Sequence, residues 1–407
     1  MWFDQQTVIT LKQPDGLFKS EFGDNMILEN FTTSYLTAPG DNYGSTMYKV
    51  EATIKNNKFS KSKMIHAVAK MVPAVDFLRK CFESERTFPK EIAMYKEVLP
   101  AYRILQQDAG VQEDDLFDGA PKFYGARLSL LGDEMVDEDA AILLENLSID
   151  NYKIGNRITG MDLRHAKLVI QNLAKFHGLG IALKLKRPEF FEEMRNVGGS
   201  ELINTTLFMY ENIDSVCTEL LGIPSVKQYT SSVRTTMEKS VKETYDLNEP
   251  FGTFIHDDLW TNNIMFCYNS MGVPEKVKFV DFQVFRYASP IRDLVFFILS
   301  SVVEDVIQSH FDELIDLYHQ HLINTLEEVK CNIENYTREN FNLELRKNAP
   351  NKLIDTLFMF KAITKTKSEI QNSALVSPEE FLKLPGNEIF KKKVANTVLF
   401  YLARKWI

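Results

Sequence analysis

The sequence predicts an α+β fold with two lobes, in which a small strand-rich lobe is followed by a larger, mainly helical lobe. Three observations support this prediction. Short segments of alternating or β-branched apolar residues dominate the first third of the 407-residue chain. After about Asn146, apolar residues recur instead at three- and four-residue spacing. One polar, strand-like insert, residues 252–286, interrupts the helical part.

The first lobe is predicted to contain an antiparallel sheet and one helix. Period-2 and β-branched patterns predict strands at residues 47–54, 64–72, 122–130 and 140–147. Between the second and third strands, apolar residues at helical spacing predict a helix over residues 87–99. Because proline cannot continue a helix, Pro100 is expected to end it.

The second lobe is predicted to be built from helices. The first carries one apolar face made of Leu163, Ala166, Ile170, Leu173 and His177. Further helices are expected over residues 190–221, 226–244, 293–329, 351–369 and 390–403. His177 is interpreted as a core histidine hydrogen-bonded to the backbone. Asp293 opens a helix and is expected either to cap that helix or to brace the preceding loop.

The composition excludes several classes of function. The formal net charge of -9 argues against a general nucleic-acid binder, which usually has a basic excess. The four cysteines form no CxxC pair, so reduced thiols are expected rather than zinc or disulfides. No signal peptide is visible, and the longest apolar run, residues 294–303, is too short to span a bilayer. We therefore expect a monomeric cytoplasmic protein without a membrane partner.

One segment, FIHDDLWTNNIMF, concentrates the polar residues that chemistry requires. It fits the spacing H-x-D-x-x-x-x-N at His256, Asp258 and Asn263. A second register is possible, because Asp257 and Asn262 are also five positions apart. Only Asp258 stands two positions after the histidine and precedes a leucine, as in the catalytic loop of kinases. We therefore assign the motif to Asp258.

A second element follows this loop at the spacing that phosphoryl transfer requires. The strand-like stretch VKFV is followed directly by Asp281 and by Phe282-Gln283. This DFQ triplet is similar to the metal-binding D-F-G of kinases, with Gln283 in place of glycine. Phosphoryl transfer from ATP needs Mg²⁺, which hard oxygen ligands hold. We predict Asn263 and Asp281 as these ligands. Asp258 is predicted to accept or orient the proton of the acceptor hydroxyl, and His256 to orient the loop.

The strand-rich lobe supplies a candidate phosphate-binding lysine. Lys70 lies inside an apolar strand, where an unpaired ammonium would be costly. Glu91, near the start of the following helix, is predicted to pair with Lys70, because a Lys–Glu pair belongs to kinase machinery. Lys63 and Lys80 are rival candidates in more polar surroundings.

A glycine turn precedes the lysine strand and completes an order typical of kinase-like enzymes. Backbone amides around Gly44 and the hydroxyl of Ser45 are expected to cover phosphates, although the turn is neither a Walker loop nor a full G-x-G-x-x-G. Residues 1–146 are therefore predicted to form a nucleotide-binding N-lobe. Residues 147–407 are predicted to form a C-lobe with the catalytic loop and the acceptor site.

Together these motifs resemble the ecdysteroid kinase-like (CHK-kinase-like) family of insects, which is related to choline kinases and aminoglycoside phosphotransferases. The resemblance rests on FIHDDLWTNNIMF and VDFQVFRYASPIRDL, and it extends upstream to KMVP, FPKEIAMYKEVLP, LLENL and LAKFHGLG. It implies a bilobal protein-kinase-like fold and a role in detoxification. It also implies MgATP-dependent phosphorylation of a hydroxyl on an ecdysteroid, another steroid-like alcohol or a xenobiotic. Glu145 and Leu147, in the hinge, join the implied nucleotide-binding set.

The chain departs from this family at Asp257, where glycine is usual. Aspartate tolerates a positive φ better than most residues, but its carboxylate adds a like charge beside Asp258. Two alternatives stay open: a catalytically silent, pseudokinase-type ligand-binding protein, and a kinase of the choline or ethanolamine type. A protein kinase is disfavoured, because no A-P-E segment follows DFQ and Ser289-Pro290 leaves no room for an activation loop.

Overall fold

The chain forms two compact units, each described here by itself. A computed structural model describes residues 10–36, 44–57, 59–132, 135–199, 209–242, 249–365 and 384–407. Unit 1 comprises Met1–Pro100, Ala120–Lys153 and Asp281–Gln283. Unit 2 comprises Ala101–Gly119, Ile154–Val280 and Val284–Ile407. The first contains an antiparallel sheet and the second is mainly helical, which confirms the predicted α+β class. The functional division at residue 146 stays a prediction.

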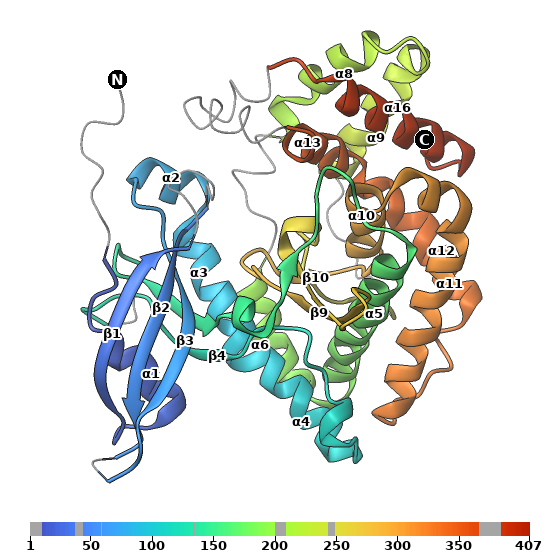
Figure 1. The fold of residues 1–407 in the computed structure, drawn as a ribbon. Helices are drawn as coiled ribbons and strands as arrows, with labels where there is room; N and C mark the ends of the chain where they lie inside the picture. The colour runs from blue at the N-terminus through green and yellow to red at the C-terminus, as the bar shows by residue number, and fades with distance from the viewer. Residues whose placement is uncertain are drawn as a thin grey trace. The chain divides into compact units, whose positions relative to one another are not determined.

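The described part of unit 1 is organised around a sheet with the strand order β1-β2-β3-β5-β4, in which neighbours pair antiparallel (Figure 1). The strands are β1 Ile27–Tyr35, β2 Thr46–Lys55, β3 Lys63–Met71, β4 Phe123–Arg127 and β5 Ala141–Glu145. All four predicted strands are present. The edge strand β1 was not predicted, because its mostly exposed residues lack the alternating apolar pattern on which the prediction depended.

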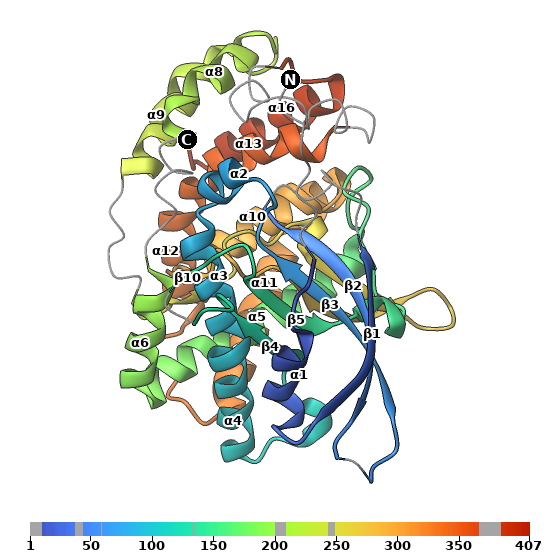
Figure 2. The same cartoon turned by 90° about the vertical axis from the view of Figure 1, so that its left-hand side faces the viewer.

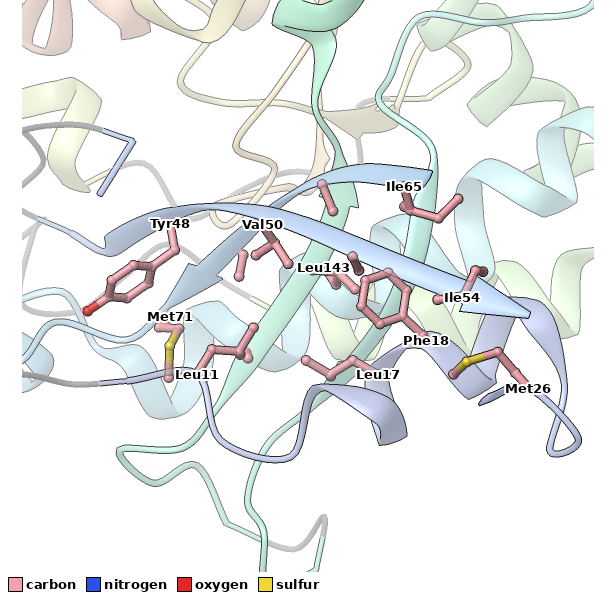
Figure 3. Close-up of a cluster of buried hydrophobic side chains, with 14 residues drawn as sticks. Leu11, Leu17, Phe18, Met26, Tyr48, Val50, Ile54, Ile65, Met71 and Leu143 are labelled. Carbon is pink, nitrogen blue, oxygen red and sulfur yellow. The ribbon is translucent and has the colours of Figure 1, made fainter. Parts of the chain in front are cut away.

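A buried apolar cluster joins this sheet to helix α1, Pro14–Phe22, which was also not predicted. Every second residue of β2 is buried, as the period of a half-covered strand requires. Figure 3 shows Leu17 and Phe18 of α1 pointing toward strand β2, which carries Val50 and Ile54. The cluster consists of Leu11, Leu17, Phe18, Met26, Tyr48, Val50, Ala52, Ile54, Ile65, Ala67, Ala69, Met71, Ala141 and Leu143. Each large side chain buried there contributes about 1.5–3 kcal/mol relative to an exposed one.

The predicted helix over residues 87–99 is present, but its predicted end was wrong. The chain passes through α2 Asp76–Cys81, α3 Ser84–Ala93, a π-helical turn Met94–Val98 and α4 Leu99–Ala109 without stopping at Pro100. Proline is tolerated in the first turn of a helix, because its missing N–H is needed least there. Pro100 occupies such a position in α4, immediately after the π-helical turn.

Unit 2 contains helices and short strand pairs (Figure 2). Its helices in the described ranges are α5 Leu163–Lys186, α6 Pro188–Gly198, α8 Ile213–Leu221, α9 Thr230–Lys242, α10 Ile291–Ser301, α11 Glu304–Glu328, α12 Arg338–Asn348, α13 Leu353–Ile363 and α16 Glu388–Ala403. Strand β7 Thr253–Ile255 pairs with β10 Arg286–Ala288, and β8 Ile264–Tyr268 pairs with β9 Pro274–Phe279. Every residue of α10 is buried, including the charged Arg292 and Asp293.

Several predicted helix boundaries in unit 2 were wrong. The helix predicted over residues 293–329 is split into α10 and α11. Val302 and Val303 are extended between them, because the N–H of Met161 donates to Ser301 O and the N–H of Val303 to Met161 O. Similarly, α6 ends before Gly199, which has a φ of 59°. Residues 200–208, 243–244 and 366–369 of the predicted helices lie outside the described residues. In the part of the chain that the structure describes, no helix is long and apolar enough to cross a membrane.

A tight contact between α1 and β4 predicts a stability effect in unit 1. A Cβ added at Gly125 would lie 2.0 Å from the carbonyl oxygen of Leu17, so Gly125→Ala must displace α1. We expect this overpacking to lower the free energy of unfolding by about 1–3 kcal/mol. Gly16→Ala is the matched control, because a Cβ there meets nothing within 4 Å. Urea unfolding checks the prediction, and equal midpoints for the two variants would contradict it.

Candidate active site

The predicted Lys70–Glu91 pair is formed in unit 1. Lys70 is only 3% exposed, and its Nζ lies 2.5 Å from Glu91 Oε2 and 2.7 Å from Asp281 Oδ1. Gln283 Oε1 accepts a longer hydrogen bond of 3.4 Å from the same nitrogen. The rival Lys80 is 78% exposed at its side chain and pairs with Asp76. Strand β3 therefore delivers one buried ammonium to the DFQ segment.

The electrostatics of this cluster follow from its burial. Burial alone would lower the pKa of Lys70, but the carboxylates of Asp281 and Glu91 outweigh it and raise that pKa. Lys70 therefore stays charged. Burial also raises the pKa of Glu91 to about 7, although the Lys70 ammonium opposes the shift. Glu91 therefore titrates near neutral pH.

The backbone and ring contacts of the DFQ segment hold Asp281 beside Lys70. Asp281 has a φ of 69°, a left-handed conformation that few residues other than glycine adopt, and its side chain is 31% exposed. The next residue, Phe282, is fully buried and meets the ring of Tyr95 edge-on at 5.5 Å. Tyr95 lies in the π-helical turn, a feature that often marks functional sites. Helical spacing places Tyr95 on the apolar face of the predicted helix, but no motif linked it to the DFQ segment.

The remaining predicted nucleotide-binding residues of unit 1 are placed as follows. A Cβ at Gly44 would lie 3.6 Å from the side-chain amide nitrogen of Gln283, so Gly44 approaches the DFQ segment, whereas residues 40–43 of the predicted glycine turn lie outside the described residues. Ser45 is partly buried next to it. Glu145 ends β5, and its carboxylate accepts a hydrogen bond from the backbone N–H of Lys122. Leu147 is 4% exposed and begins a 3₁₀ turn, Leu147–Asp150.

The predicted catalytic loop lies in unit 2, between β7 and β8. His256 is fully buried, and its Nε2 donates to the carbonyl oxygen of Val280 at 2.9 Å. A carbonyl only accepts, so Nε2 carries the proton. Nδ1 is then an acceptor, and the backbone N–H of Asp258 donates to it at 3.4 Å. His256 therefore orients the loop from within.

The amide of Asn263 joins the two ends of the motif. Its Nδ2 donates to the backbone oxygen of Asp258 at 2.8 Å and to Asp258 Oδ2 at 3.0 Å. These two acceptors decide the orientation of the amide, so Oδ1 is the atom able to bind a hard cation. Asn262, from the alternative register, is exposed. The structure therefore favours the register with Asp258 and Asn263.

Asp293 fixes the backbone of this loop. Its carboxylate accepts the N–H groups of His256 and Asp257 at 2.6 and 2.7 Å. Burial would raise the pKa of Asp293, but His177, which donates from Nε2 at 3.1 Å, helps to hold it below its usual value. The N-cap of α10 is Pro290, so Asp293 braces the loop and does not cap the helix.

The expectation of a backbone partner for His177 was wrong. The imidazole is fully buried, as predicted, but its two nitrogens bond to side chains, Asp293 and the hydroxyl of Tyr318, the latter at 2.7 Å. It is the carbonyl oxygen of His177 that takes part in a backbone contact, accepting from Thr253 Oγ1 at 2.8 Å. Gly180 permits this close packing of α5 on β7, because a Cβ there would lie 2.2 Å from Thr253 Oγ1.

Asp257 has the positive φ considered in the sequence analysis, 63°. Its carboxylate, however, faces cations: Arg286 Nε lies 2.6 Å from Oδ2, and Lys352 Nζ lies 2.7 Å from Oδ1. Burial would raise the pKa of Asp257, but Arg286, Lys352 and Arg292 hold it well below its usual value. The added charge beside Asp258 is therefore compensated. No motif pointed to Lys352, which is 95 residues from Asp257 in the sequence.

The model of the ecdysteroid kinase-like family matches residues 39–331. This chain belongs to the ecdysteroid kinase-like family. The family match includes the Lys70–Glu91 pair, the catalytic loop and the DFQ segment, and it ends before Lys352.

Two solved structures are similar to the chain. An ethanolamine kinase of Plasmodium vivax is 12% identical at a TM-score of 0.40, with 95% of this chain and 85% of that chain covered. A choline/ethanolamine kinase family protein of Mesorhizobium loti is 8% identical at a TM-score of 0.31, with 89% and 92% covered. No curated protein matches. The membership therefore rests on the family match.

The raised pKa of Glu91 predicts a pH dependence of stability. Because the folded protein holds this proton up to about pH 7 and the unfolded chain only to about 4.5, the contribution of Glu91 is complete below pH 4.5. It is lost as the pH rises through about 7. Glu91→Gln should therefore flatten the decline in the free energy of unfolding across this interval. Glu97→Gln, on the partly exposed side of the same helical segment, is the control. Denaturant titrations at several pH values test this, and identical slopes for wild type and Glu91→Gln would refute it.

A second prediction concerns Asp293. Asp293→Asn keeps the shape but replaces one acceptor oxygen by an NH₂ group, which leaves a buried backbone N–H unpaired. Hydrogen bonds to charged groups contribute about 1.5–3 kcal/mol each, so we expect a loss of at least about 2 kcal/mol in the free energy of unfolding. Asp312→Asn, at an exposed ion pair with Arg404, should leave the unfolding midpoint nearly unchanged. An unchanged midpoint for Asp293→Asn would show that the loop does not depend on this carboxylate.

Proposed function

We propose that this protein is a small-molecule kinase that transfers the γ-phosphate of ATP to a hydroxyl group. Family membership supports the proposal. The observation that carries it is the buried Lys70, whose ammonium contacts both Glu91 and the DFQ residue Asp281. A buried lysine held by two carboxylates costs desolvation energy that a core of apolar residues would avoid. Such an arrangement is expected where a cation must meet phosphate oxygens.

The donor set fits MgATP. Asp281 offers a partly exposed carboxylate and Asn263 an amide oxygen whose nitrogen is already engaged, which are the hard ligands that Mg²⁺ prefers. When bound, MgATP supplies the γ-phosphoryl group and the metal charge that stabilises its transfer. Lys70 then binds phosphate oxygens, and Glu91 holds the lysine in position.

The other nucleotide contacts are assigned from their place in unit 1. Backbone amides around Gly44 and the hydroxyl of Ser45 cover the phosphates. Glu145 contributes through its main chain, because its carboxylate already accepts from Lys122. Leu147 contributes apolar surface.

Asp258 is assigned to the acceptor hydroxyl. Its carboxylate is half-buried and is fixed through Oδ2 by the amide of Asn263. From this position it orients the hydroxyl and accepts its proton as the bond to phosphorus forms. His256 is a positioning residue, since both its ring nitrogens are engaged with backbone groups.

The acceptor is proposed to be an ecdysteroid or another steroid-like or xenobiotic alcohol. The family supports this class. Choline and ethanolamine are the competing acceptors, and a silent ligand-binding protein is the competing function. Each corresponds to a different outcome of one experiment.

The experiment measures transfer of labelled γ-phosphate from MgATP to a panel of ecdysone, a sterol, a plant secondary alcohol, choline and ethanolamine. We expect a labelled steroid or xenobiotic product. Asp258→Asn should lower kcat by about 10²–10⁴-fold while ATP binding, measured by calorimetry, is retained. Asp312→Asn is the control for an acidic residue far from the motif in sequence. Labelling of choline or ethanolamine alone would correct the acceptor class. ATP binding without any product would favour the silent protein, and equal rates for Asp258→Asn would remove Asp258 from its role.

A further inference from the structure

A buried group of charges surrounds the one residue of the catalytic loop that departs from the family pattern. Arg286 of β10, Arg292 of α10 and Lys352 at the end of the 3₁₀ turn Ala349–Lys352 are 1%, 4% and 2% exposed. Asp257 lies among them, with contacts of 2.6 Å to Arg286, 2.7 Å to Lys352 and 3.7 Å to Arg292. Asp355 contacts Lys352 at 3.3 Å and Arg292 at 3.9 Å.

In the contacts given above, these three cations meet the carboxylates of Asp257 and Asp355. Each carboxylate offsets part of the cost of burying the cations. The two carboxylates differ in one respect. Asp355 belongs to α13, whereas Asp257 is part of the loop itself and directly precedes Asp258.

The backbone of Asp257 has a left-handed conformation that its contacts stabilise. A φ of 63° is unfavourable for a residue with a Cβ, so this conformation must be held by its surroundings. The N–H of Asp257 is held by Asp293, and Lys352 Nζ also donates to its carbonyl oxygen at 3.3 Å. The side chain, N–H and carbonyl of Asp257 are therefore all held by buried groups, which come from β10, α10 and the 3₁₀ turn Ala349–Lys352.

We propose that Asp257 is a positioning residue for the phosphoryl transfer proposed above. Its carboxylate, held by Arg286 and Lys352, sets the direction in which the chain leaves the loop and so the place of the Asp258 carboxylate. The inference rests on the proposed function. It also gives a role to Lys352, which lies beyond the residues that the family model matches.

The test compares two carboxylates in the same charge group. Asp257→Asn keeps the size and the tolerance for positive φ, but removes the charge from the loop. Asp355→Asn removes one negative charge beside Arg292 and Lys352 but leaves the loop sequence unchanged. The reaction uses MgATP and the panel alcohol that the wild type phosphorylates. We expect Asp257→Asn to lower kcat by about 10- to 100-fold, as for a misplaced catalytic group, with KM for ATP unchanged. Asp355→Asn should retain nearly the wild-type kcat.

A double variant separates positioning from charge burial and keeps the test valid if Asp257→Asn folds poorly. Asp257→Asn with Lys352→Met removes one negative and one positive charge, so the net charge of the group is the same as in the wild type. We expect it to recover thermal stability but not kcat. Recovery of kcat in the double variant would overturn the proposal. So would equal losses of kcat in Asp257→Asn and Asp355→Asn, or a wild-type kcat in Asp257→Asn.

Hydrogen exchange distinguishes failure of this inference from failure of the proposed function. If the wild type phosphorylates no panel member, the proposed function fails, but exchange in peptides covering residues 254–259 still reports the order of the loop. We expect faster exchange there in Asp257→Asn than in Asp355→Asn. Equal exchange in the two variants would overturn the positioning role independently of any activity.

Discussion

In unit 2, one buried carboxylate holds the backbone of the predicted catalytic loop. Asp293 accepts the N–H groups of two consecutive loop residues and a third hydrogen bond from His177. Burial would raise the pKa of Asp293, but the hydrogen bond and charge of His177, together with His256, hold that pKa below its usual value, so the group remains an ionised acceptor. The carbonyl oxygen of Val280 accepts from His256 Nε2 and so places the imidazole proton on that nitrogen. The two oxygens of Asp258 accept from Asn263 Nδ2 and so fix the orientation of the side-chain amide. Each step follows from the rule that buried polar groups are hydrogen-bonded.

Unit 1 also contains a buried charged group, but here the charge is positive. Lys70 is buried in an apolar strand and remains charged because two carboxylates contact it. Glu91 shares this burial fully, and burial raises its pKa to about 7. The side chain of Asp281, by contrast, is 31% exposed. Phe282 packs on Tyr95 of the π-helical turn and so couples the position of Asp281 to the helix that carries Glu91.

Much of this arrangement could be predicted, because the signals are local. Strands β2, β3, β4 and β5 were recognised from period-2 patterns, and Lys70 from the contrast between its charge and its apolar strand. The elements that were missed lack such signals. Strand β1 is exposed, α1 is short, and the break at Val302–Val303 depends on hydrogen bonds to Met161, far away in the sequence. The continuation of the helix through Pro100 depends on a π-helical turn that no spacing rule detects.

The sequence by itself determined the family, the α+β class, the order of the motifs and the residue types able to bind a metal ion or accept a proton. These are properties of short segments, since periodicity and spacing are written in consecutive residues. Only the tertiary structure decided which polar groups meet. In the folded chain, Asp293 accepts hydrogen bonds from the loop backbone, and His177 bonds to two side chains. Asp257 lies among buried cations from β10, α10 and the 3₁₀ turn before α13. Such partners are chosen by packing, because burial makes an unpaired charge costly whatever its distance along the chain.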